Sequence, residues 1–159
     1  MVKRVVGSVA GIVVLLLALL VIGMRWKLSP VLTAVRRMNR AVSNPRVLRT
    51  AGSAGDQNSV ICHVGRTSGR SYRTPVTAIP TTTGFLIALP YGTRADWLRN
   101  VLAAGSAMIV TDGEQLDVID PKIVATTDVA DVLPGSTRRA LSVFGVGECL
   151  HLERVPTPA

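Results

Sequence analysis

Residues 60–89 read VICHVGRTSGRSYRTPVTAIPTTTGFLIAL and hold three short apolar runs separated by glycine, proline and polar residues. Runs this short and this rich in β-branched side chains are typical of β-strands, and the residues between them are typical of turns. Two further runs follow, AMIVT at 107–111 and QLDVI at 115–119. Residues 81–84 and Asp112-Gly113 are short enough to join neighbouring strands as hairpins. The chain is therefore predicted to be mainly β, of the α+β class.

Helices and later strands are expected around this sheet. A helix is predicted over residues 95–104, where Thr93 or Asp96 can cap the start and Gly105 can close the end. After Pro121 we expect another strand, a helix and a last strand, at residues 123–125, 137–144 and 149–155. Strands in this order with one or two helices indicate a small antiparallel barrel with helices packed outside it.

The N-terminal part of the chain is apolar enough to enter a membrane. Residues 5–24 form a run of 20 residues without a charge, and a helix of that length covers a hydrocarbon core of about 30 Å. The triplet Arg25-Trp26-Lys27 follows and is typical of the lipid headgroup region. A secretory signal peptide is the alternative, but the run is long for one and no small-residue cleavage site follows it. We predict an uncleaved transmembrane anchor over residues 1–27, an amphipathic helix and linker over 28–57, and a folded domain over 58–159.

Positive charge is concentrated beside this segment. Residues 1–55 hold nine basic residues and no acidic one, whereas the rest of the chain holds nine basic and ten acidic residues. Because more cations follow the apolar run than precede it, we predict a single-pass membrane protein with its domain on the cytoplasmic face. Membrane lipid is an expected partner, and nucleic acid is not, since the distal domain has no basic excess. Cys62 and Cys149 would stay reduced there, and we expect both in the core.

A second helix is predicted directly after the apolar run. Residues 30–42, PVLTAVRRMNRAV, place apolar side chains at helical spacing with arginines elsewhere around the helix. This helix lies either on the membrane surface or against the folded domain. Asn44-Pro45 is expected to end it.

The turn between the first two runs is rich in hydrogen-bond donors. Arg66, Arg70 and Arg73 stand beside Gly65 and Gly69. Glycines let backbone amides approach a ligand, and guanidinium groups match phosphate or carboxylate oxygens. The pattern indicates an anion-binding site, and the alternative is a solvated loop. The two histidines of the chain stand far apart without clustered Cys, Asp or Glu, so no metal site is predicted.

Further short motifs follow this turn at fixed places along the chain. With the turn itself they are Gly65-Arg66-x-Ser68-Gly69, Pro75, Tyr91-Gly92, Asp96-Trp97, Asn100 and Ala103-Ala104-Gly105. In order and spacing the sequence resembles the deazaflavin-dependent nitroreductase family, the split-barrel flavin and deazaflavin oxidoreductases of mycobacteria and other actinobacteria. The resemblance covers residues 28–155 and implies a split β-barrel of six or seven antiparallel strands. It also implies a reduced deazaflavin coenzyme, F420, whose phosphodiester and oligoglutamate tail are negatively charged.

The resemblance implies a role for each motif. The arginine turn would bind the anionic tail, and the strand after Pro75 would lie along the ring system. Tyr91 and Gly92 would form a turn against the cofactor, buttressed by Trp97 and Asn100, with Tyr91 as the candidate catalytic proton donor. The implied cofactor-binding residues are Arg66, Thr67, Ser68, Arg70, Arg73, Pro75, Val76, Thr77, Tyr91, Gly92, Trp97 and Asn100.

The function that follows from the resemblance is a membrane-anchored, F420H2-dependent oxidoreductase. It would transfer a hydride to a lipophilic acceptor such as a quinone, a nitro compound or an activated double bond. Two alternatives stay open, namely a non-catalytic barrel that holds a fatty acid or another lipid, and a redox protein that binds FMN. Assembly into an oligomer is compatible with all three.

Overall fold

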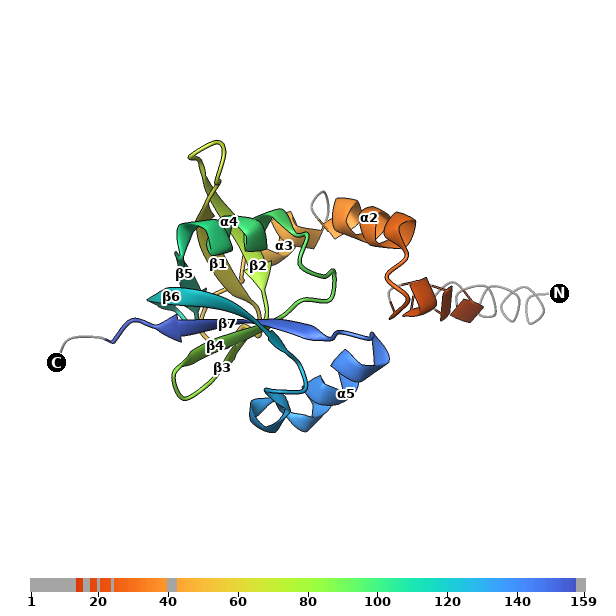
Figure 1. Cartoon of the computed structure of the whole chain (residues 1–159). Helices are drawn as coiled ribbons and strands as arrows, with labels where there is room; N and C mark the ends of the chain where they lie inside the picture. The colour runs from red at the N-terminus through yellow and green to blue at the C-terminus, as the bar shows by residue number, and fades with distance from the viewer. Residues whose placement is uncertain (1–13, 16–17, 20, 24, 40–42, 157–159) are drawn as a thin grey trace.

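The computed structural model describes residues 14–15, 18–19, 21–23, 25–39 and 43–156 (Figure 1). Its helices are α2 (Ser29–Met38), α3 (Asn44–Val47), α4 (Asp96–Ala104), the short 3-10 helix η2 (Ala130–Val132) and α5 (Gly135–Val143). Its strands are β1 (Ser59–Val64), β2 (Ser71–Val76), β3 (Ala78–Pro80), β4 (Gly84–Ala88), β5 (Ser106–Thr111), β6 (Glu114–Ala125) and β7 (Glu148–Arg154).

Each apolar run singled out in the sequence forms β-structure, with two differences in extent. The second run is divided into β2 and β3, and β2 begins earlier than predicted because Tyr72 and Arg73 pair with the end of β1. The separate strand predicted at 123–125 is instead the second half of β6, which continues past Asp120 through a register shift between Ile119 and Lys122. Both predicted hairpins are confirmed, since β3 pairs with β4 and β5 pairs with β6 in antiparallel fashion.

The strands form a single seven-stranded antiparallel sheet in the order β2-β1-β5-β6-β7-β4-β3. The two edge strands, β2 and β3, follow each other in the chain with only Thr77 between them. The sheet therefore curls until its two edges meet at that residue (Figure 1). This curled antiparallel sheet with a few helices fits the predicted split barrel.

The main core lies on one face of the curled sheet. Ile61, Ile109 and Val118 come from three neighbouring strands and are completely buried there. Leu98 and Val101 of α4 are also completely buried and belong to the same cluster. Helix α4 packs against β1, β5 and β6, so this helix completes the main core and its position is fixed by the sheet.

A second core cluster lies beneath α5, on the opposite face of the sheet. Leu86 and Cys149 from neighbouring strands β4 and β7 pack with Leu141 of α5. The helix predicted at 137–144 is thus confirmed as α5, and the predicted core position of Cys149 is confirmed as well. Cys62 is only half-buried, and neither cysteine forms a disulfide.

The ends of α4 match the sequence prediction at one end only. Gly105 closes the helix in the left-handed conformation with φ of 70°, as predicted. The N-cap, however, is Ala95, which has no side-chain oxygen to accept a hydrogen bond. The predicted caps are therefore wrong: Thr93 lies too early and Asp96 is already the first helical residue, where its negative charge still suits the helix dipole.

The N-terminal segment is described only in part. The predicted span at 5–24 falls largely outside the described residues, and within the described ones no helix is long and apolar enough to cross a membrane. The predicted amphipathic helix appears as α2, with Leu32 buried and Met38 exposed. Asn44-Pro45 does not simply end it, since α3 begins at Asn44 with the proline in its first turn.

Candidate functional site

The arginine-rich turn, residues 65–70, is a tight bend between β1 and β2 whose shape depends on glycine. The Gly65 amide donates to the Arg70 carbonyl at 2.8 Å, and the Gly69 amide donates to the Gly65 carbonyl at 2.8 Å. A Cβ atom on Gly65 would lie 2.5 Å from Ser68 Oγ, so the Ser68 side chain would have to move. Gly69 has a φ of 64°, which other residues rarely adopt. Gly69 is thus required by the backbone of the bend, and Gly65 leaves room for the Ser68 and Tyr72 side chains.

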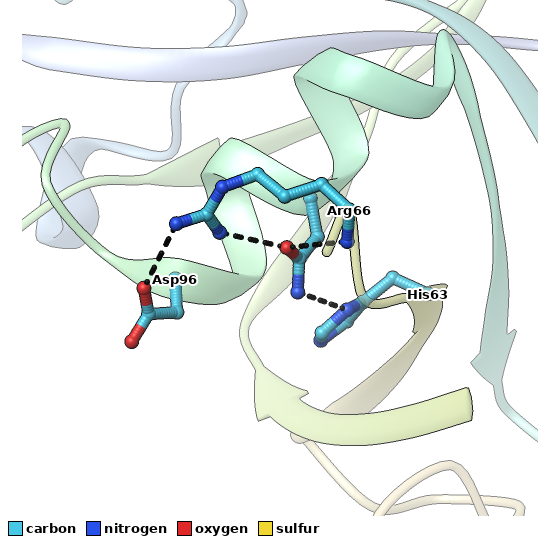
Figure 2. A network of polar contacts seen from close by, with 4 residues as sticks. His63, Arg66 and Asp96 are labelled. Carbon is cyan, nitrogen blue, oxygen red and sulfur yellow. Dashed lines mark hydrogen bonds and ion pairs between the residues drawn. The ribbon is translucent and has the colours of Figure 1, made fainter. Parts of the chain in front are cut away.

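Asn100 holds this bend from the side of α4. Its Oδ1 accepts a hydrogen bond from the Arg66 backbone amide at 3.2 Å and another from Arg66 Nη1 at 2.8 Å. Arg66 Nη2 also lies 3.5 Å from Asp96 Oδ1, at the start of the same helix (Figure 2). Because Asn100 is buried and sits on a helix fixed by the core, it sets the position of both the backbone and the side chain of Arg66.

His63 extends the hydrogen-bond network from Asn100 into the interior. Asn100 Nδ2 lies 3.2 Å from His63 Nδ1, and His63 Nε2 lies 3.2 Å from Thr74 Oγ1. Because Asn100 Oδ1 is already an acceptor for Arg66, its amide nitrogen must be the donor to His63. The imidazole therefore accepts at Nδ1 and carries its proton on Nε2, which donates to Thr74. The ring of Tyr72 stacks on this imidazole with a centroid distance of 5.7 Å.

Burial of His63 gives the network a pH dependence. Desolvation lowers the pKa of His63 from its ordinary value of about 6.5. The unfolded chain then takes up this proton at a higher pH than the folded chain does. The contribution of His63 to stability is therefore complete above pH ~6.5 and is lost as the pH falls through the lower, folded pKa, by about 1.4 kcal/mol for each unit between the two pKa values.

The His63→Gln variant removes the titrating group and tests this expectation. Thermal unfolding of both proteins between pH 8 and 5 is expected to show a steeper loss of Tm for the wild type below pH ~6.5. Other groups titrate equally in both proteins and cancel in the comparison. Parallel Tm curves would contradict the assignment of His63 as a buried neutral imidazole.

The three arginines of the turn do not converge on one point. The guanidinium of Arg66 is directed to α4 by its bonds to Asn100 and Asp96. Arg73 pairs with Cys62 in the register of β1 and β2, whereas Tyr72 pairs with His63, so Arg73 lies on the opposite face of the sheet from Tyr72. The single arginine clasp expected from the sequence is thus divided: within the turn Arg66 is directed to α4, and Arg70 is the second, exposed arginine of the turn.

Two backbone amides at the tip of the bend point to an anion site. Within the described part of the chain, no acceptor is bonded to the amides of Thr67 and Ser68. The Ser68 hydroxyl lies 3.3 Å from the Tyr72 hydroxyl and 3.4 Å from the Arg70 amide. Successive amides in a turn, hydroxyl groups and one exposed guanidinium form a donor set that suits phosphate or carboxylate oxygens.

The residues implied to lie along the cofactor ring occupy the end of β2. Pro75 and Val76 are half-buried, and Val76 packs against the main core. Thr77 is exposed and lies between β2 and β3, where the two edges of the sheet meet. These residues form one continuous segment with the strand that leaves the bend.

The remaining predicted residues are divided between two places. The turn after β4 is formed by Tyr91 and Gly92, with φ of 70° at Gly92, and the Tyr91 hydroxyl accepts a hydrogen bond from Asn39 Nδ2 at 2.7 Å. Trp97 is half-buried and packs against the main core. Asn100 forms its hydrogen bonds with the bend and with the interior imidazole, rather than buttressing the Tyr91 turn as the resemblance implied.

Sequence reasoning missed His63, which was considered only as a metal ligand. The alternation of β1 was the available signal, since His63 lies two positions after Ile61, a fully buried core residue, and so faces the interior.

Among the described residues, no group of three or more His, Cys, Asp or Glu could hold a metal ion. A surface hollow of about 530 Å³ at the β3-β4 hairpin is lined by residues 80–85 and 153–156, none of which was predicted to bind the cofactor.

Comparison with known proteins gives only structural similarity. No family model matches the sequence, and no curated protein matches it. The heme storage protein HutZ from Vibrio cholerae is 12% identical, covers 72% of this chain and 90% of its own, and has a TM-score of 0.45. An F420-H2 dependent reductase is 14% identical, and the similarity covers 61% of this chain and 94% of the reductase, with a TM-score of 0.39. An FMN-binding protein from Syntrophomonas wolfei is 16% identical, and the similarity covers 78% of this chain and 92% of that protein, with a TM-score of 0.41. At these values the similarity identifies neither a family nor an activity for this chain.

Proposed function

We propose that this chain is a split-barrel oxidoreductase whose bend at residues 65–70 binds the phosphate-bearing tail of a deazaflavin cofactor, F420. The observation that carries the proposal is the pair of amides at Thr67 and Ser68, exposed at the tip of a bend that Asn100 fixes from α4. Such amides bind anionic oxygens. A bend fixed in advance loses little conformational entropy when a ligand binds.

The side chains around the bend have different roles in binding. Arg70 is exposed beside the two amides and supplies the positive charge for a phosphate. The hydroxyls of Ser68 and Tyr72 lie 3.3 Å apart, so one of their two protons is used in the bond between them and the other is left for a ligand. Arg66 links the bend to α4, since its guanidinium is bonded to Asn100 and Asp96.

The reaction we propose is reduction of a lipophilic acceptor such as a quinone. The deazaflavin supplies the hydride when it is bound. Tyr91 is the candidate proton donor, because the hydrogen bond that its hydroxyl accepts from Asn39 polarises the O–H bond. An N-terminal anchor with the domain on the cytoplasmic face would bring the barrel to acceptors that dissolve in the bilayer. The basic excess of residues 1–55 supports this placement.

Cofactor titration of the purified full chain in detergent tests the proposal. F420 and FMN are titrated separately and followed by their fluorescence at increasing salt. We expect F420 to bind more tightly and to weaken with salt, because its recognition is electrostatic. Arg70→Ala is expected to weaken F420 binding roughly tenfold or more, since a charge-assisted hydrogen bond contributes about 1.5–3 kcal/mol.

The matched control is Arg73→Ala, which removes the same charge from the opposite face of the sheet. It is expected to change F420 affinity by less than about twofold, as for a screened surface charge. Equal loss in both variants would refute the assignment of the tail to the bend. Tighter binding of FMN, or binding of a labelled fatty acid without either cofactor, would support one of the two alternatives instead.

A further inference from the structure

The C-terminal end of α5 is packed against the residue that follows the predicted membrane span. Arg25 Nη1 donates to the Ser142 carbonyl at 2.7 Å, and the Val143 carbonyl lies 3.5 Å away. Cations are favourable at this end of a helix, where backbone carbonyls lack partners. The next turn fits closely around the same residue, because a Cβ atom on Gly145 would lie 3.3 Å from the Arg25 side chain.

This contact brings α5 to the side of the barrel from which the N-terminal segment leaves. In Figure 1, α2 and the C-terminal end of α5 lie on the same side of the barrel, and the end of β7 lies on the opposite side. If residues 5–24 span a bilayer, Arg25 stands at its surface. The carbonyls that bind Arg25 then place the last turn of α5 at the same depth.

The exposed side chains in this region suit a lipid surface. Arg138 and Arg139 are exposed on α5, which carries no acidic residue. Val143, at the end of the helix, keeps 50% of its surface exposed, and Trp26 keeps 72%. Cations combined with exposed apolar and aromatic side chains are typical of helices that lie at a membrane interface.

We propose that Arg138, Arg139 and Val143, which we term the α5 surface, rest on an anionic bilayer beside the N-terminal anchor. This inference rests on the proposed membrane anchoring and adds a second contact between the protein and the membrane. Cations are attracted to an anionic membrane surface, and the valine adds apolar burial. Two contacts fix the orientation of the barrel, whereas a single anchor leaves it free to rotate.

Depth-dependent quenching tests the α5 surface in the full chain. The chain is reconstituted in nanodiscs of phosphatidylcholine, with and without phosphatidylglycerol, that contain nitroxide-labelled headgroups. A fluorophore is attached to Val143→Cys in a Cys62→Ser background, where the remaining Cys149 is buried. The matched label is at Thr83→Cys, an exposed position on the β3-β4 hairpin. We expect several-fold stronger quenching at position 143 than at 83, most of all with the anionic lipid, and a loss of that excess in Arg138→Gln/Arg139→Gln.

The anchor is monitored separately through Trp26 in a Trp97→Phe background. Quenching of Trp26 together with equal, weak quenching at positions 143 and 83 would overturn the α5 surface while the anchor stands. Absence of quenching at Trp26, with the chain released from the nanodiscs, would overturn the anchor and the α5 surface together. Neither result touches the proposed cofactor site, which is tested in detergent.

Discussion

Replacing Asn100 by alanine is expected to destabilise the folded chain by about 3 kcal/mol. One buried amide is bonded to the backbone and guanidinium of Arg66 and to the imidazole of His63. Its removal leaves a backbone donor, a charged donor and a buried acceptor without that partner. In thermal unfolding of the full chain in detergent, a domain of this size should then lose at least about 10 °C in Tm. F420 affinity should also fall by about tenfold, because the bend is no longer fixed before binding.

The Asn100→Asp variant separates the two halves of this network. A carboxylate at position 100 still accepts from Arg66, but it has no hydrogen to donate to the neutral imidazole. The carboxylate instead favours a proton on His63 Nδ1, so the pKa of His63 should rise above that in the wild type. This change is followed by NMR titration of the imidazole. If Asn100→Ala and wild type unfold at the same temperature, Asn100 does not hold the bend.

Replacing Gly84 by alanine is expected to have an effect at least as large. The added Cβ atom would meet the Leu152 carbonyl oxygen of β7, and it would lie 2.9 Å from the Arg154 amide nitrogen. Both are backbone atoms of the strand that pairs with β4, so neither can turn aside as a flexible side chain could. Relief requires the two strands to separate at this point. We expect a loss of about 3 kcal/mol or more, read as a fall in Tm of at least about 10 °C.

Gly147→Ala is the matched control for this substitution. A Cβ atom on Gly147 meets no other atom within 4 Å, and its backbone is not in the left-handed region. The same chemical change should therefore leave Tm within a few degrees of the wild type. A Gly84→Ala protein as stable as Gly147→Ala would show that β4 and β7 are not paired closely at Gly84.

Much of the sheet could be predicted because its strands are short, apolar and separated by turn residues. The pattern was misleading at Asp120-Pro121, which reads as a turn between two strands. In the structure, β6 absorbs the irregularity as a bulge and continues its pairing with β7. This bulge lies in the pairing of β6 with β7, and β7 is distant from β6 in sequence. The local sequence therefore could not distinguish a bulged strand from two separate ones.

The candidate site shows the same division between local and distant information. The glycines of the bend could be singled out in the sequence, and the left-handed conformation of Gly69 is set by the adjacent chain. The pairing of Arg66 with Asn100 could not, since 34 positions separate them and only the docking of α4 brings them together. The face of the sheet on which the Arg73 side chain lies likewise depends on which residue of β1 pairs with it.

The meeting of β2 and β3 at Thr77 has a consequence for how copies of this chain can associate. One continuous segment supplies both edge strands of the sheet, so each edge strand is only a few residues long. Pro75 and Pro80 lie in these edge strands and have no backbone hydrogen to offer to an incoming strand. Addition of a foreign strand, the usual first step toward amyloid-like stacking, is thereby disfavoured at both edges.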